Sequence, residues 1–148
     1  MVLDLKWLFH KKTLCTILFC ALSGIAMAES EPTCDEFPLS MKVEHIGKTE
    51  LTALICGDKL FLSVTELFGF LRIKASDDPQ QNALVGYIRG MDDTYRIDVL
   101  NRTIAYQGNI FGLSETDIKK QRSAIFLGQE ILYKVFGLKS TFNYRNLS

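Results

Sequence analysis

Few residues of this chain could do chemistry, and each has a plain structural explanation. His45 stands alone in an alternating apolar and polar stretch, without the CxxC or HxH spacing of a zinc site. Ser63 and Ser114 lack the G-x-S-x-G pattern of a nucleophile elbow. Both serines have the spacing of helix capping boxes instead. The sequence therefore predicts no catalytic residue, no cofactor, no metal ligand and no enzymatic activity.

The acidic and basic residues point to no particular ligand. The pairs Asp77-Asp78 and Asp92-Asp93 lack the D-x-[DN]-x-[DN]-G loop of a calcium site, and turn chemistry explains both. The chain has 17 basic and 17 acidic residues, and no basic run interleaved with aromatic residues. This balance argues against a nucleic-acid partner.

The first 28 residues, 1–28, have the form of a secretory signal peptide. A basic beginning precedes the apolar stretch Leu14–Ile25, and Ala26-Met27-Ala28 provides the small residues that signal peptidase requires. The alternative is a retained membrane anchor, but the stretch is shorter than the roughly 20 residues that span a bilayer. We therefore expect a mature chain that begins at Glu29, has no membrane span and lies in the periplasm or cell envelope.

Export bears on the cysteines. Cys15 and Cys20 leave with the signal peptide, whereas Cys34 and Cys56 remain. In an oxidising compartment an even pair of cysteines tends to form a disulfide. Two free thiols are the alternative, and a metal site is poorly supported because His45 is the one histidine left in the mature chain.

The elements that would position these residues are mostly short strands. Residues 29–40 are expected to form an extended lead-in, and residues 41–148 a single domain. Alternating patterns and turn residues predict strands at 41–46, 51–55, 60–62, 72–75, 83–88, 95–99, 103–106, 110–113, 124–127 and 138–144. Helices are predicted at 64–71 and 128–136, and a short polar helix or turn at 114–122.

Two of these stretches resemble each other. "FLSVTELFGFLRIKAS" (61–76) returns 65 residues later as "FLGQEILYKVFGLKST" (126–141), with Leu62 matching Leu127 and Leu67 matching Leu132. Either the two are independent turns with common apolar patterning, or they form a pseudo-repeat. Both readings predict an α+β fold: a mainly antiparallel sheet with two or three short helices and two pseudo-repeated strand–helix–strand units.

Most of the aromatic residues are expected to lie in the core. Phe68 and Tyr133 occupy equivalent helix positions in the two copies, and of the aromatic side chains we expect these two to be partly exposed. They are the residues predicted to contribute to a partner surface.

The ordered phrases "LFLSVTELFGFLRIK", "ALVGYI", "YRIDVLNRTIAYQGNIFGL" and "AIFLGQEILYKVFGLKSTFNYRNLS" resemble the N-terminal periplasmic region of large usher-like outer-membrane proteins of Gram-negative bacteria. More loosely, they are similar to the small α+β domain named for the N-terminus of copper amine oxidases. The match covers Val43 to Ser148 and implies no copper site. The usher-like proteins continue into further domains and a barrel, whereas this sequence stops.

The resemblance implies a non-enzymatic interaction or scaffolding module of the cell envelope, a truncated N-terminal piece of a larger usher-like protein. Its partner would be an envelope protein or the downstream domains of a longer parent. Two other functions stay open. Exposed Phe or Tyr in a groove would favour a cell-wall or glycan-binding domain, and clustered carboxylates in a pocket would favour a small secreted hydrolase.

Overall fold

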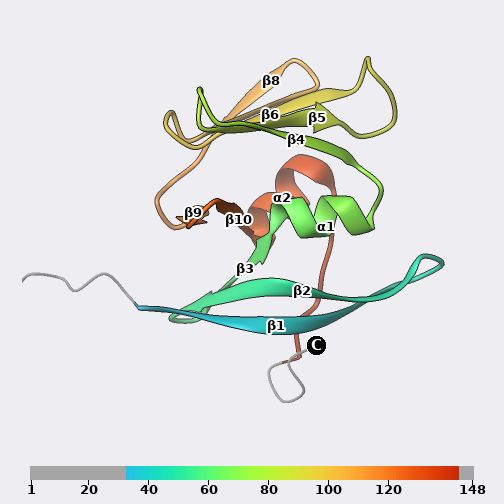
Figure 1. The fold of residues 1–148 in the computed structure, drawn as a ribbon, viewed down its shortest axis with the longest axis vertical. Coiled ribbons are helices and arrows are strands. Elements are labelled where there is room, and N and C mark those ends of the chain that lie inside the picture. The colour runs from blue at the N-terminus through green and yellow to red at the C-terminus, as the bar shows by residue number, and fades with distance from the viewer. Residues whose placement is uncertain (1–32, 144–148) are drawn as a thin grey trace, which may run out of the picture.

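The computed structural model describes residues 33–143, which form two antiparallel sheets with two helices between them (Figure 1). Strands take up 51% of these residues and helices 14%. The predicted α+β fold with one main sheet and two or three helices is therefore wrong: the fold is β-rich, with two sheets of five strands each. The expected signal peptide, residues 1–28, lies outside the described residues.

The first sheet has the order β1-β2-β3-β10-β9, so it combines strands from both ends of the described chain. Its members are β1 (Cys34–Val43), β2 (Gly47–Cys56), β3 (Lys59–Ser63), β10 (Ala124–Gly128) and β9 (Ile118–Gln121). Strand β1 pairs with β2 over its whole length. Residues 34–40, expected to belong to an extended lead-in, are thus part of the sheet.

The second sheet is a meander whose strands follow the chain order, β4-β5-β6-β7-β8. They are β4 (Lys74–Asp78), β5 (Ala83–Tyr87), β6 (Thr94–Asp98), β7 (Thr103–Tyr106) and β8 (Asn109–Gly112). These strands form a separate sheet because α1 leads the chain away from β3 before β4 begins. Asp77 and Asp78, expected in a loop, pair with Leu84 and Ala83 of β5.

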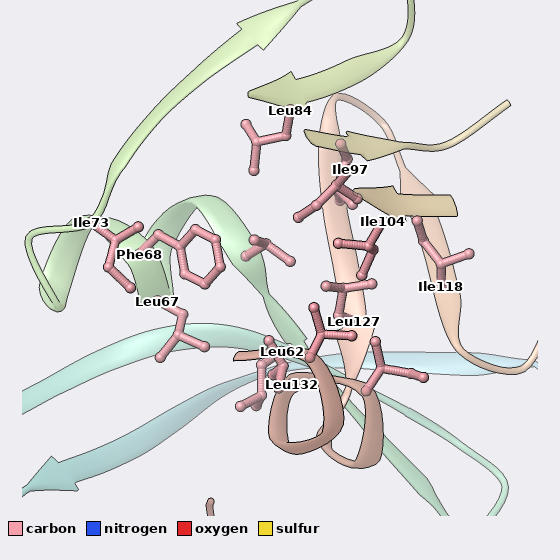
Figure 2. Packing of buried hydrophobic residues seen from close by; sticks show 14 of the residues in the cluster. Leu62, Leu67, Phe68, Ile73, Leu84, Ile97, Ile104, Ile118, Leu127 and Leu132 are labelled. Carbon is pink, nitrogen blue, oxygen red and sulfur yellow. The ribbon is translucent and has the colours of Figure 1, made fainter. Parts of the chain in front are cut away.

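Helices α1 (Val64–Phe70) and α2 (Gln129–Phe136) fill the space between the sheets. The alternation of β5, β6 and β7 brings Leu84, Ile97 and Ile104 into one row, and all three are fully buried. Figure 2 shows them pointing from the second sheet toward the helices and the first sheet. This main core holds the two sheets together, because burial of each leucine- or isoleucine-sized side chain is worth about 1.5–3 kcal/mol.

Four aromatic rings tie α1 and α2 to the second sheet. Phe136 of α2 lies 5.3 Å from Phe68, 5.7 Å from Tyr95 and 5.4 Å from Tyr106, measured between ring centroids. Phe68 and Tyr95 meet edge to face at 5.3 Å. Edge-to-face pairs of this kind add about 0.5–1.5 kcal/mol beyond the area they bury.

The Tyr95 side chain also extends from β6 across β5 to β4. Its hydroxyl donates a hydrogen bond to the Lys74 carbonyl of β4 at 3.0 Å, and burial raises the pKa of the phenol. The ring crosses Gly86, which lies opposite Tyr95 in β5. A Cβ at Gly86 would stand 1.8 Å from the Lys74 carbonyl oxygen and 2.8 Å from the Tyr95 hydroxyl. Glycine is therefore required at this position by the close approach of two strands and a ring.

The similar stretches 61–76 and 126–141 share a strand followed by a helix. Leu62 and Leu127, which match in sequence, lie directly opposite each other where β3 pairs antiparallel with β10. The helix that follows each strand ends in a left-handed residue at matching positions, Arg72 (φ 58°) and Gly137 (φ 70°). The likeness stops there, because residues 138–143 form no strand, whereas β4 follows α1. The prediction of two strand–helix–strand units is wrong, and so is that of a strand at 138–144 over its described residues, 138–143.

The capping box predicted at Ser63 is also wrong. Ser63 occupies the N-cap position of α1, yet its hydroxyl makes no capping bond and is buried without a hydrogen-bond partner. Glu66, expected to reach back to Ser63, instead accepts hydrogen bonds from the backbone N–H and the hydroxyl of Thr52 in β2. Strand β2 supplies two donors to this carboxylate, more than the one N–H of a capping box.

This geometry predicts that Ser63→Ala leaves the free energy of unfolding unchanged or raises it by about 1 kcal/mol, because it removes a buried, unsatisfied hydroxyl. Ser114→Ala is the matched control. The Ser114 hydroxyl donates to Asp117 at 2.6 Å, so this change should cost about 1 kcal/mol. Urea unfolding of the two variants decides between them, and a Ser63→Ala loss equal to that of Ser114→Ala would contradict the prediction.

A second, smaller core lies on the other face of the first sheet. Leu54, Phe61 and Phe126 are buried there, since they alternate with main-core residues along their strands. Glu36 of β1 accepts a hydrogen bond from Gln121 of β9 at 2.9 Å and lies 3.7 Å from the Arg122 guanidinium. Strands β1 and β9 are the two edges of the sheet, so these side-chain interactions bridge the sheet's edges.

The predicted disulfide is confirmed. Cys34 and Cys56 stand opposite each other at the ends of β1 and β2, bonded with a Cα–Cα distance of 4.3 Å. The bond closes a loop with a sequence separation of 22 residues, and a loop of this size should stabilise the fold by roughly 3 kcal/mol in the chain-entropy model.

We therefore expect the double variant Cys34→Ser/Cys56→Ser to unfold with roughly 3 kcal/mol less stability than the oxidised protein. Thermal or urea unfolding of the variant, compared with the parent protein with and without reductant, measures this difference. The reduced parent should match the variant. Equal midpoints for the oxidised and reduced parent would contradict the prediction.

Candidate functional site: a groove beside the β1–β2 hairpin

A groove of about 1190 Å³ lies between the β1–β2 hairpin and the segment that follows α2. The tip of the hairpin projects beyond the helices, and the segment after α2 crosses the hairpin (Figure 1). We call this the hairpin groove. Its lining residues are 39–43 of β1, 48–50 of β2, Leu60 and Leu62 of β3, Gln129 of α2, and 139–143.

The inner surface of the groove is apolar, and it arises from strand alternation. Leu39, Leu60 and Leu62 are each at most 5% exposed, while Met41 and Val43 are half-buried. Along β1 these apolar residues recur at every second position, so they share one face. The apolar strip therefore continues the main core outward along the projecting hairpin.

The second wall depends on the end of α2. Gly137 adopts the left-handed conformation, and its N–H donates to the Tyr133 carbonyl at 2.9 Å, which turns the chain out of the helix. The side-chain amide of Gln129 donates a hydrogen bond to the Ser140 hydroxyl at 2.9 Å. The Phe142 ring lies 6.3 Å from that of Phe37 in β1. These contacts hold residues 139–143 alongside the hairpin.

Three lysines border the groove, but Lys42 and Lys48 alternate with Met41 and Thr49 along their strands, so they point to the opposite face of the hairpin from the apolar strip. Lys42 and Lys48 lie directly opposite each other in the β1–β2 pairing, and Lys139 stands on the other wall. None of the three forms an ion pair with any residue between 33 and 143. Glu50 is the single carboxylate in the lining. Like charges directly opposite each other in a sheet are unfavourable, so Lys42 and Lys48 repel each other on the face of the hairpin that points away from the apolar strip.

A shallower pocket of about 290 Å³ lies along β1 and β2 and gathers three carboxylates: Glu36, Glu50 and Glu66. Two of them are already engaged, Glu36 by Gln121 and Arg122, and Glu66 by Thr52. Their partners explain their positions structurally. Within residues 33–143 no group of three or more His, Cys, Asp or Glu side chains is placed to hold a metal ion.

Of the two residues predicted to contribute to a partner surface, Phe68 is fully buried, so its expected exposure is wrong. The physical reason is that α1 lies against β6 and α2, where Phe68 meets Tyr95 and Phe136. Tyr133 is 59% exposed, but it does not line the groove. His45, expected in a strand, stands in the hairpin turn with φ 64°.

The sequence reasoning missed the groove. Its walls come from segments about a hundred residues apart, and only the fold brings them together. The sequence contained one signal of the groove. Leu39, Met41 and Val43 recur at every second position, which predicts an apolar face on this strand.

The chain matches no family model, no curated protein and no solved structure. The resemblance to usher-like proteins consequently stays a prediction. Neither helix within residues 33–143 is long and apolar enough to span a bilayer.

Proposed function

We propose that this protein is an exported, non-enzymatic interaction module of the cell envelope, and that the hairpin groove holds a segment of its protein partner. The observation that carries the proposal is the groove itself, whose apolar inner surface lies between two walls of five consecutive residues, 39–43 and 139–143. The Cys34–Cys56 disulfide supports export, since such bonds persist in oxidising compartments. The partner would be another envelope protein or downstream domains of a longer parent.

The groove favours this function over a glycan-binding one. Sugar-binding surfaces rely on exposed aromatic rings, and Phe142, which is half-buried, is the one aromatic side chain among the described residues that line the groove. A hydrolase is less favoured because two of the three clustered carboxylates are held by Thr52, Gln121 and Arg122. The groove offers an elongated apolar surface instead, which suits a polypeptide.

Photo-crosslinking in the native host tests the proposal. A photoreactive amino acid replaces Thr141, which is exposed on the groove wall, or Thr94, which is exposed on the second sheet. We expect irradiation to join Thr141 variants to one protein of the envelope and to leave Thr94 variants unlinked. The partner is identified by mass spectrometry, and its linked residues should fall in one short segment. Equal or absent adducts at the two positions would count against the groove as the partner site.

A further inference from the structure

Strand β1 is the longest of the four strands that form the edges of the two sheets. It has ten residues and pairs with β2 alone among the described strands, and no further strand lies beyond it (Figure 1). We infer that two copies of this chain associate through this edge. Their β1 strands would pair antiparallel, centred on Leu39, and extend the first sheet across a two-fold axis. This inference goes beyond the proposed function and does not depend on it.

The backbone groups that β1 presents at its open edge follow from the position of Thr52. This residue lies opposite Pro38, but its N–H donates to Glu66 in α1, and proline has no N–H to offer in return. The two residues therefore exchange no hydrogen bond. Because such pairs alternate with bonded pairs along an antiparallel ladder, Glu36 and Lys42 also turn their N–H and C=O groups away from β2. The open edge thus offers donors and acceptors at every second residue, apart from the donor that Pro38 lacks.

The charges along this edge are complementary to themselves in one register. When two β1 strands pair around Leu39, Glu36 of each copy lies directly opposite Lys42 of the other, on the face that points away from the apolar strip. Lys42 has no ion-pair partner within residues 33–143, and Lys48 repels it from the neighbouring strand. A carboxylate on the other side of Lys42 relieves that repulsion, and the two-fold axis provides it twice.

Neighbouring registers are less favourable. Pairing centred on Ser40 sets Glu36 against Glu44 of the other copy, which opposes two carboxylates. Pairing centred on Pro38 sets two residues without an N–H against each other. The charge pattern and the proline therefore both favour the pairing around Leu39.

The apolar face agrees with the same register. Leu39 lies opposite its own equivalent, and Phe37 lies opposite Met41 of the other copy, so the two apolar strips form one continuous surface. A single strand edge is smaller than the roughly 1,200–2,000 Å² that stable complexes bury. We therefore expect a weak dimer that forms as the protein concentration rises.

The existing contacts of Glu36 are compatible with this pairing. Glu36 accepts a hydrogen bond from Gln121 and lies 3.7 Å from the Arg122 guanidinium. A carboxylate has about four lone-pair sites, so Lys42 of the second copy adds to these contacts rather than replacing them.

Sedimentation equilibrium of the disulfide-bonded protein, purified after export, tests the inference. We expect the mean mass to rise from that of a monomer toward that of a dimer between about 1 μM and about 1 mM protein. Lys42→Glu should weaken the association about tenfold or more, because symmetry repeats each like-charge contact. The monomer should stay folded, since a glutamate opposite Lys48 is favourable.

A charge swap separates the ion pair from net charge. Glu36→Lys alone should weaken the dimer as Lys42→Glu does, whereas Glu36→Lys/Lys42→Glu should restore its affinity to within about twofold. Lys134→Glu, at an exposed position of α2, makes the same charge change as Lys42→Glu and should alter the affinity less than about twofold. Urea midpoints of all variants are compared, because Glu36→Lys also removes the contact with Arg122.

Photo-crosslinking tests the register directly. A photoreactive amino acid at Ser40, which is exposed on β1, should link to Pro38 or its neighbours in the second copy, and one at Thr94 should not. Mixing copies labelled with nitrogen-15 and unlabelled copies identifies links between molecules. This measurement and Lys42→Glu decide alone where Glu36→Lys unfolds the protein.

A monomer at every concentration would overturn the inference and would mean that Pro38 and Lys42 protect the edge from pairing. A dimer that withstands Lys42→Glu would overturn it as well. So would a folded double variant that does not regain the affinity, or links from Ser40 to residues outside β1.

Discussion

Replacing Phe68 with alanine should lower the free energy of unfolding by about 3–5 kcal/mol, the range for buried phenylalanine truncations. Phe68 is fully buried and meets Tyr95 and Phe136 edge to face, so its removal leaves a cavity where α1, α2 and the second sheet join. Near-ultraviolet circular dichroism followed through urea unfolding reports both the stability and the packing of these rings.

The control for this change is provided by the repeat. Tyr133 takes the equivalent place in α2 but is 59% exposed, so Tyr133→Ala should change stability by less than about 0.5 kcal/mol. Similar losses from the two substitutions would mean that Phe68 is not the buried member of the pair.

The second large effect concerns the leucines that recur in both copies. Leu67→Ala and Leu132→Ala should each destabilise the protein by roughly 2–5 kcal/mol, because both side chains are nearly inaccessible in the main core. Urea unfolding measures each variant against the parent protein. Leu100→Ala, at a turn where the side chain is 71% exposed, is the control and should be near neutral. A parent-like midpoint for either core variant would contradict the common packing role of Leu67 and Leu132.

Local sequence patterns predicted the positions of helices and strands better than they predicted how the strands assemble into sheets. The helix expected at 64–71 is observed as Val64–Phe70, and the disulfide forms as expected. Periodicity shows that a segment is a strand, but it does not show which sheet the strand joins. The division into two sheets depends on β3 pairing with β10 rather than with β4, and that pairing is set by the tertiary core.

The errors share a cause, which is competition from distant partners. Glu66 has a capping spacing, but Thr52 of a neighbouring strand binds it. Phe68 and Tyr133 are equivalent in sequence, yet only the first faces the second sheet. Leu138 and Phe142 alternate as predicted and are half-buried, but their segment forms no ladder with any strand among the described residues. The groove could not be predicted because it exists only between such segments.

The split order of the first sheet has a consequence for how the chain folds. Short turns join the neighbouring strands from β4 to β8. In contrast, β3 pairs with β10, where Leu127 lies 65 residues beyond its partner Leu62. Local pairings form before distant ones, because closing a long loop costs more chain entropy. We expect the meander to be native-like in the folding transition state and β10 to dock after it.

Kinetic comparison of Ile97→Ala, in the meander, with Leu127→Ala, in β10, tests this order, since both side chains are fully buried. Ile97→Ala should mainly slow folding, and Leu127→Ala should mainly speed unfolding. Until β10 arrives, β3 presents an open edge that another chain could occupy. The interval between formation of the meander and docking of β10 is therefore when the chain would be most prone to aggregate, and a chaperone that shields β3 would act in that interval.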